Sequence, residues 1–391
     1  MTEIAENSLV TQLIEGFENR YGHHPDVVAR APGRLEILGN HTDYNEGVVL
    51  SVAVDRATCF AASLADGPDC QIHDLRDGST RTFSVADITA GMTKGDWANY
   101  IKGIIIELQE RDLTVPGFDA CILSDIPLSA GMSSSAALEI ATAYGLGKLA
   151  GVELPWIEWA KIGQACENKT VGANTGLMDQ FSSIRGNKNQ LVFSDFRSLR
   201  TSNVPLPEGT ALVVANSMVK HNLTNEYNNR RQSCEAAAEA VSRSYPDVKA
   251  LRDVTKEMLD ACRDKMDITS YRRALHVVGE NRRVFDGIKA LEAGDIKTFG
   301  RLMFESHESS RLNFENSCAE LDALIDIGKA LPGAIGARLS GGGFGGITVH
   351  LVEEAEAENY AQRLATAFES LLEIDPEVMI CHAGDGVAVV E

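Results

Sequence analysis

Hydrophobic positions recur along this chain with two different periods. Three stretches of the first half show the 3.6-residue spacing of a buried helix face: residues 8–20, 97–111 and 134–149. Strand patterns, either apolar runs or alternation at period two, occupy other parts of the same half: residues 48–54, 57–63, 80–85, 118–126, 190–193 and 211–215. The first half of the chain is therefore predicted to be rich in strands.

Helical spacing dominates the second half, where it is nearly continuous from residue 227 to about residue 330. Two strands are predicted after it, at 336–339 and 346–352, followed by a helix at 355–372. Because strand-rich and helix-rich blocks are segregated, the pattern favours an α+β fold over alternating β-α units. A length of 391 residues suits two domains, and we place the boundary near residue 205, which gives domains 1–205 and 206–391.

Composition and charge narrow the classes of function. Hydrophobic residues make up 44% of the chain and charged residues 24%, the balance of an ordinary globular protein. The net charge of −20 disfavours binding to nucleic acid or to an anionic membrane surface. The chain shows no signal-peptide layout, no apolar stretch of ~20 residues and no C-x-x-C pair among its eight cysteines. We expect a cytoplasmic protein with no nucleic-acid or membrane partner.

A serine-rich segment between a predicted strand and a predicted helix is the first candidate for chemistry. Residues 127–137 read PLSAGMSSSAA, and such small side chains let the backbone approach a ligand closely. The free N–H groups and the dipole of the following helix attract phosphate. The segment is not a Walker A loop, because it lacks Gly-Lys-Ser/Thr at the required spacing. Taken alone, it is equally consistent with a plain helix cap.

A glycine-rich segment is the second candidate. Residues 340–346 read SGGGFGG and lie between two predicted strands. Five glycines in seven positions exceed what a hairpin turn requires. Close approach of the backbone to a ligand or to a neighbouring loop would explain the excess, with a flexible hairpin as the alternative.

Two further segments concentrate polar side chains. Residues 31–45 read APGRLEILGNHTDYN, and their amide and carboxylate groups suit hydrogen bonds to vicinal hydroxyls while an arginine suits phosphate. Residues 172–180 read GANTGLMDQ, where Asp179 stands alone among small and apolar residues. Such a carboxylate is either a helix cap or a functional group. Spacing alone also leaves open that the first of these segments is a solvated loop.

Taken in chain order, these segments resemble the GHMP small-molecule kinases and, among them, the galactokinases. Further likenesses occur throughout the chain: Trp97-Ala-Asn-Tyr100, Gly176-Leu-Met-Asp-Gln-Phe181, Glu226-Tyr-Asn-Asn-Arg-Arg231, His276-Val-Val-Gly-Glu-Asn281 and Glu305-Ser-His307. The resemblance implies a two-lobe GHMP kinase fold, with a strand-rich N-terminal lobe and a helix-rich C-terminal lobe. It also implies transfer of the γ-phosphoryl group of ATP to the C1 hydroxyl of galactose.

The same resemblance assigns roles to individual residues. Asp179 would orient the C1 hydroxyl or accept its proton, and Arg34 would offset the charge of the γ-phosphate and keep Asp179 ionised. The implied sugar-binding residues are Asn40, His41, Asp43, Gly176 and Tyr227, besides Arg34 and Asp179. The implied nucleotide-binding residues are Gly131, Ser133, Ser134 and Ser135 on the phosphate side and Trp97 and Tyr100 on the adenine side. Ser135 and Glu167 would bind Mg²⁺.

One residue departs from the galactokinase pattern. Galactokinases usually have Glu at the position of Asn40, where it is expected to accept a hydrogen bond from the C6 hydroxyl. Asn is shorter, uncharged and also a donor. A sugar altered at C6 or C2 is therefore an alternative substrate: galacturonate, L-arabinose or N-acetylgalactosamine. A non-catalytic sugar sensor is the alternative from another class, although such sensors lose part of the serine-rich loop, which is intact here.

Overall fold

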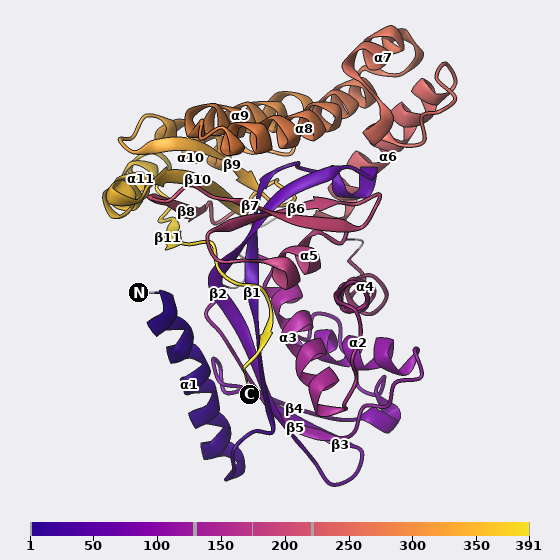
Figure 1. The fold of residues 1–391 in the computed structure, drawn as a ribbon, viewed down its shortest axis with the longest axis vertical. Helices are drawn as coiled ribbons and strands as arrows, with labels where there is room; N and C mark the ends of the chain where they lie inside the picture. The colour runs from indigo at the N-terminus through magenta and orange to yellow at the C-terminus, as the bar shows by residue number, and fades with distance from the viewer. Residues whose placement is uncertain (1, 128–130, 174, 220–222, 391) are drawn as a thin grey trace. The chain divides into compact units, whose positions relative to one another are not determined.

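The computed structural model describes residues 2–127, 131–173, 175–219 and 223–390, and its elements are labelled in Figure 1. The helices are α1 (Thr2–Tyr21), α2 (Ala98–Gln109), α3 (Ser134–Leu149), α4 (Trp156–Ala165), α5 (Met178–Arg185), α6 (Leu223–Ser242), α7 (Lys256–Ala261), α8 (Ile268–Glu292), α9 (Ile296–Ser309), α10 (Ala319–Lys329) and α11 (Ala357–Leu372). The strands are β1 (Val27–Leu38), β2 (Val48–Leu64), β3 (Asp69–Asp74), β4 (Thr80–Ser84), β5 (Phe118–Ser124), β6 (Gln190–Asp195), β7 (Arg200–Pro205), β8 (Thr210–Asn216), β9 (Ala334–Ser340), β10 (Ile347–Glu353), β11 (Glu377–Cys381) and β12 (Ala388–Val389).

The chain divides into two compact units, each built from segments that are not consecutive in the sequence. The first unit consists of Met1–Arg34, Ala53–Gly186 and Gly384–Glu391, and the second of Leu35–Val52 and Asn187–Ala383. The single cut predicted near residue 205 does not match this division, because β6 and β7 belong to the second unit. There β6 pairs antiparallel with the first residues of β2, and β7 pairs with β6. A hydrophobic pattern carries no information about such long-range pairing.

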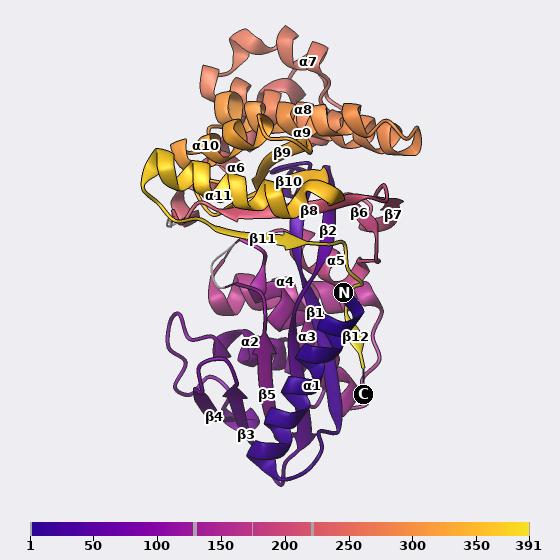
Figure 2. The ribbon, with the colours of Figure 1, turned by 90° about the vertical axis from the view of Figure 1, so that its left-hand side faces the viewer.

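The first unit is a sheet covered by helices on both faces. In it β1 pairs with β12, β2 pairs antiparallel with β5, and β3 lies between β5 and β4. Helix α1 lies along one face (Figure 2), where Leu13 and Phe17 pack on Val28, Cys59 and Cys121. Helix α3 packs on the opposite face, where the backbone of α3 comes so close that a Cβ added at Gly145 would meet the Phe60 ring.

The second unit is built on an antiparallel sheet of strand order β11-β8-β10-β9. Apolar side chains of α10 and α11 cover one face, with Leu324, Leu364 and Phe368 in contact with Val213 and Val352 of the strands. Helices α8 and α9 lie side by side (Figure 1), and α9 packs directly on β9. This arrangement confirms the predicted α+β segregation, with most of the helical residues after 223.

The predicted strands leave out five observed strands, β1, β3, β7, β11 and β12, and divide β2 in two. Strands β7 and β12 are short, polar or exposed, and β11 is only partly buried, so their alternation is weak. Strand β2 is continuous across Asp55 and Arg56, where two strands were predicted. The ladder continues there because backbone hydrogen bonding does not require apolar side chains.

The structure also describes the cysteines and the apolar character of the helices. All eight cysteines are free thiols, and seven of them are buried. Within the described ranges, no helix has both the length and the apolar character that crossing a bilayer requires.

Close packing of α9 on β9 leads to the first prediction. A Cβ added at Gly300 would lie 1.9 Å from the Ile335 carbonyl oxygen, so Gly300→Ala forces backbone atoms apart. We expect this change to lower the free energy of unfolding by about 1–3 kcal/mol, the usual scale of overpacking. Chemical denaturation followed by circular dichroism measures it.

Gly279→Ala is the matched control, because a Cβ at this helical glycine would meet only the end of the Arg283 side chain, 3.0 Å away, and no backbone atom. We expect its unfolding free energy to stay within ~1 kcal/mol of the wild type, the range of helix propensities. Equal destabilisation by both changes would contradict the packing account.

Candidate functional site

The candidate residues separate into two groups, one in each unit. The first unit contains Arg34, Trp97, Tyr100, Gly131, Ser133, Ser134, Ser135, Glu167, Gly176 and Asp179, and the second contains Asn40, His41, Asp43 and Tyr227. The side chain of Tyr227, in α6, lies outside the described part of the chain, as do residues 128–130 of the serine-rich segment.

A two-pronged contact between Arg34 and Asp179 is the centre of the first group. Arg34 lies within β1, four residues before the strand ends, and Asp179 lies in the first turn of α5. The guanidinium donates to both carboxylate oxygens, from Nε at 2.8 Å and from Nη2 at 3.0 Å. Both side chains are largely buried, with 8% and 17% exposed. Parallel charge-assisted bonds of this kind fix orientation as well as energy.

The serine-rich loop is joined to this pair. Arg34 Nη1 donates to the Gly131 carbonyl at 2.6 Å, and Ser133 Oγ donates to Asp179 Oδ2 at 2.5 Å. Ser133 precedes α3 in a left-handed conformation, with φ of 54°. Gly33 allows the close approach, since a Cβ there would lie 2.9 Å from the Met132 carbonyl oxygen. The first N–H groups of α3 therefore start beside a charged pair, as a phosphate site requires.

Glu167 lies in a buried hydrogen-bond network on the same side of the unit. Its Oε1 accepts from Ser135 Oγ at 2.9 Å, and its Oε2 accepts from Thr175 Oγ1 at 2.5 Å. Burial raises the pKa of Glu167, and the nearby charge of Asp179 adds to the rise. Gly176 follows Thr175 in the segment that leads into α5.

Two members of this network were not identified from the sequence. Gln180 is fully buried, and its Nε2 donates to Glu167 Oε2 at 3.3 Å and to Glu139 Oε2 at 3.1 Å. Burial raises the pKa of the Glu139 carboxyl well above its ordinary value, with the charge of Glu167 as the second cause. A glutamate inside an otherwise apolar helix, one turn after Ser135, was the signal that could have revealed it.

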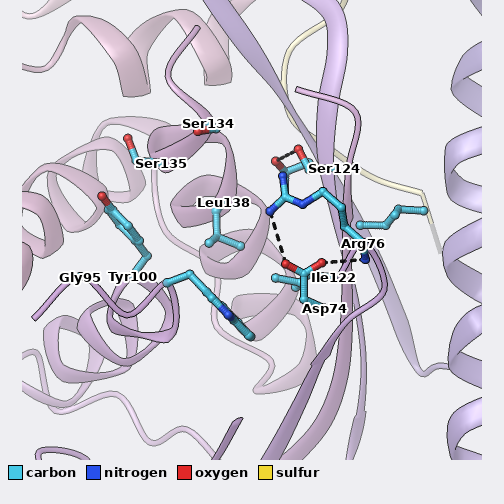
Figure 3. Close-up of a pocket in the computed structure, with 12 residues that line it drawn as sticks. Asp74, Arg76, Gly95, Tyr100, Ile122, Ser124, Ser134, Ser135 and Leu138 are labelled. Carbon is cyan, nitrogen blue, oxygen red and sulfur yellow. Dashed lines mark hydrogen bonds and ion pairs between the residues drawn. The ribbon is translucent and has the colours of Figure 1, made fainter. Parts of the chain in front are cut away.

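The serine-rich loop also borders a cavity of about 410 Å³ (Figure 3). Ser134, Ser135 and Leu138 line one part of it, and Trp97 and Tyr100 line another. Trp97 and Tyr100 are only half-buried, whereas Ile101, Ile104, Ile105 and Leu108 of the same helical stripe are buried. The two aromatic side chains therefore face the cavity instead of the core. Arg76 is the one cation among the described residues that line this cavity.

A divalent cation would find a suitable but incomplete donor set at Ser135 and Glu167. Mg²⁺ favours oxygen ligands and commonly uses one or two protein groups together with substrate phosphates and water. The hydroxyl and carboxylate lie 2.9 Å apart, and Ser135 lines the cavity. Over the described ranges no cluster of three or more ligating side chains occurs, so such a cation would have to share its ligands with a phosphate.

Asn40 has its side chain committed inside the second unit. It is 1% exposed, and its Nδ2 donates to both oxygens of Glu36 and to the Gly341 carbonyl. Its Oδ1 accepts from Asn316 Nδ2 at 3.0 Å. The backbone around it is held too, because Glu280 accepts from the N–H groups of Gly39 and Asn40.

His41 is buried and held in one tautomer. Its Nε2 lies 3.1 Å from the Gly342 carbonyl, which can only accept, so Nε2 carries the proton. Its Nδ1 then accepts from the Tyr44 hydroxyl at 3.0 Å. Burial lowers the pKa of His41 to about 4. Asp43 follows at the start of a short 3₁₀ turn, Asp43–Asn45.

The glycine-rich segment meets a neighbouring loop, as one of the two sequence interpretations required. A Cβ at Gly343 would lie 2.1 Å from the Asn316 carbonyl oxygen, and Gly343 has φ of 82°. The N–H of Phe344 donates to that same carbonyl at 2.5 Å. Only glycine meets both demands at this position.

Comparison with known proteins decides the family. Three family models match: the galactokinase galactose-binding signature over residues 15–64, the GHMP kinase N-terminal domain over 99–187 and the GHMP kinase C-terminal domain over 288–370. A galactokinase from Roseiflexus sp. is 42% identical over 96% of each chain. A galactokinase from Glaesserella parasuis is 38% identical over 96% of this chain and 97% of its own. The chain belongs to the galactokinase family.

Solved structures agree with this family membership. Lactococcus lactis galactokinase complexed with galactose aligns with a TM-score of 0.91 at 28% identity, covering 97% of this chain and 99% of its own. A mevalonate kinase aligns with a TM-score of 0.64 at 18% identity over 91% of this chain and 99% of its own, which supports the GHMP kinase fold. As a member of the galactokinase family, the chain is a sugar kinase, an enzyme that transfers a phosphoryl group to a hydroxyl.

The buried position of His41 in this galactokinase-family chain gives the second prediction. In the folded protein the ring is expected to protonate at about pH 4, well below the ordinary 6.5, because burial disfavours the charged form. A titration of the imidazole ¹⁵N shifts by NMR measures it, with a His41→Asn variant to assign the signal. In concentrated urea the same ring should titrate near 6.5. A folded-state midpoint above pH 6 would contradict the burial of this ring.

Proposed function

We propose that this chain uses ATP to phosphorylate galactose at the C1 hydroxyl. The observation that carries the proposal is the buried Arg34–Asp179 pair joined to the serine-rich loop through Ser133 and Gly131. The match to a galactose-binding signature and the solved galactokinase with bound galactose support the choice of sugar.

The pair supplies the two charges that the reaction needs. The C1 oxygen forms a bond to the γ-phosphorus while the bond from that phosphorus to the β–γ bridging oxygen breaks, and ADP leaves. Asp179 orients the C1 hydroxyl and takes up its proton. Arg34 fixes the Asp179 carboxylate by two hydrogen bonds and offsets negative charge on the transferred group. Alignment and charge neutralisation provide most of the catalysis in phosphoryl transfer.

The serine-rich loop and the cavity beside it would bind the nucleotide. Gly131 and Ser133 to Ser135 precede or begin α3, where free N–H groups and the helix dipole favour phosphate. Trp97 and Tyr100 would lie against the adenine, because they present aromatic surface to the same cavity. The cavity volume of about 410 Å³ lies within the range of small-molecule sites.

Ser135 and Glu167 would hold Mg²⁺ together with the phosphates of ATP. When bound, this ion would neutralise negative charge on the phosphates during transfer. Gln180 and Thr175 already donate to Glu167, so the carboxylate is held in one orientation before the nucleotide arrives. Glu139, on the far side of Gln180, completes that support.

In the second unit, the residues proposed for sugar binding are Asp43, Tyr227 and the backbone around Asn40 and His41. In the first unit, the proposed residue is Gly176. The side chains of Asn40 and His41 are used within the second unit, so their contribution is to shape this segment. The reaction would take place in the cytoplasm, where ATP is supplied and where the free thiols of this chain stay reduced.

A panel of sugars tests the choice of substrate. Galactose is expected to give a kcat/KM at least ~10-fold above N-acetylgalactosamine, galacturonate and L-arabinose, since a factor of ten corresponds to one good polar contact. ADP release measures turnover, and NMR of the product places the phosphate. A higher kcat/KM for one of the other three sugars would replace galactose by that sugar, and turnover on none of them would refute the proposed function.

Asp179→Asn tests the role of the pair. We expect kcat to fall by at least ~100-fold with little change in unfolding temperature, because the amide keeps the shape but loses the charge. Asp253→Asn is the matched control, since Asp253 also accepts from both ends of an arginine, Arg197, outside the candidate site. Equal kcat values for Asp179→Asn and the wild type would contradict the assignment.

A further inference from the structure

A buried carboxylate lies directly beside Asn40. Glu36, in β1, is 2% exposed, and its two carboxylate oxygens lie 3.2 and 3.1 Å from Asn40 Nδ2. The two side chains are therefore one hydrogen-bonded pair in which the glutamate accepts and the asparagine donates. The Asn40 amide cannot be exchanged for a carboxylate without placing two negative charges in contact.

Arg338 makes the charge of Glu36 necessary. It lies in β9 with 0% exposed, and its Nη1 is 3.5 Å from Glu36 Oε1. Its Nε and Nη2 have no hydrogen-bond partner in the part of the chain that the structure describes. A guanidinium stays charged in proteins, and a buried charge is costly without a partner. One arginine is thus matched by one carboxylate.

The same pair holds the start of the glycine-rich segment. The backbone N–H of Glu36 donates to Ser340 Oγ at 2.9 Å. The N–H of Gly341 donates to Glu36 Oε2 at 3.2 Å, while its carbonyl accepts from Asn40 Nδ2 at 2.9 Å. Glu36 therefore accepts from the N–H of Gly341, and Asn40 donates to the carbonyl of the same residue. This arrangement ties the segment 39–43 to residues 340–342.

We propose that Glu36, Asn40 and Arg338 form one coupled unit. In this unit Glu36 supplies the carboxylate on which sugar binding by residues 40–43 depends, and Asn40 holds that carboxylate in position. The proposal rests on the proposed function, and it assigns sugar recognition to Glu36 and Asn40 together. Glu36 and Asn40 together keep one carboxylate, as a Glu at position 40 would, so the amide at position 40 does not by itself admit a sugar that carries a C6 carboxylate.

A double-mutant cycle tests the coupling. Asn40→Glu adds a second carboxylate, and Glu36→Asn leaves Arg338 without its partner. Each single change is expected to raise the galactose KM at least tenfold, with the ATP KM changed less than threefold. The exchange variant Glu36→Asn/Asn40→Glu again has one carboxylate and one amide, and its galactose KM is expected to lie within about fivefold of the wild type, where independent effects would multiply to about a hundredfold. Activity on galacturonate should stay below a hundredth of that on galactose in the wild type.

Glu377→Asn is the matched control. Glu377 also accepts from an asparagine amide, that of Asn216, in the same unit. We expect this change to alter the galactose KM less than twofold.

Three outcomes would overturn the proposal. The exchange variant could have a galactose KM as high as that of the worse single variant, or Glu36→Asn could leave the galactose KM unchanged. The third is efficient turnover of galacturonate by the wild type. If a single variant does not fold, a folded and active exchange variant supports the coupling, and an exchange variant that also fails to fold refutes it. Thermal unfolding of the four proteins reports the coupling even if galactose proves not to be the substrate.

Discussion

The two-pronged contact between Arg34 and Asp179 is the interaction on which the candidate site of the first unit depends. It joins β1 to the first turn of α5, and through Gly131 and Ser133 it also fixes the approach of the serine-rich loop. A carboxylate and a guanidinium this far from solvent are stable only as partners. The charge pair proposed to act in phosphoryl transfer is therefore also the contact that holds the loop in place.

Beyond this pair, the first unit buries further acidic groups at a cost in stability. Glu139 and Glu167 lie on either side of Gln180, whose single amide donates to both. Burial raises the pKa of each carboxyl, so the network is strained electrostatically before any cation is present. Such arrangements occur where function requires a perturbed group. A cation shared with the phosphates of ATP would relieve part of this cost, which is consistent with a site that becomes complete only with its substrate.

In the second unit, polar side chains hold the glycine-rich segment 340–346 in place. Side chains of the 36–41 region donate to and accept from the backbone of Gly341 and Gly342, and Asn316 contacts Gly342 and Phe344. Glycine permits these approaches but contributes no side-chain contacts of its own. The polar residues of segment 36–41 thus have two roles: they are candidates for sugar recognition, and they support the glycine-rich segment. The polar side-chain atoms of Asn40 and His41 are all hydrogen-bonded within this unit.

The sequence by itself determined most of the helices and strands, the α+β class and the family, because periodicity and short motifs are local properties of the chain. It also singled out Arg34, Asp179, Ser135 and Glu167, whose side chains the structure brings into hydrogen-bonded pairs. Only the tertiary structure decided which segments form each unit, since strand pairing between residues 48–51 and 192–195 leaves no mark in either segment. It alone revealed that Asn40 contacts Glu36 and that Glu36 faces Arg338, some 300 residues later in the chain. The charge of a buried site is the sum over residues that folding brings together, and no single position of the sequence reports that sum.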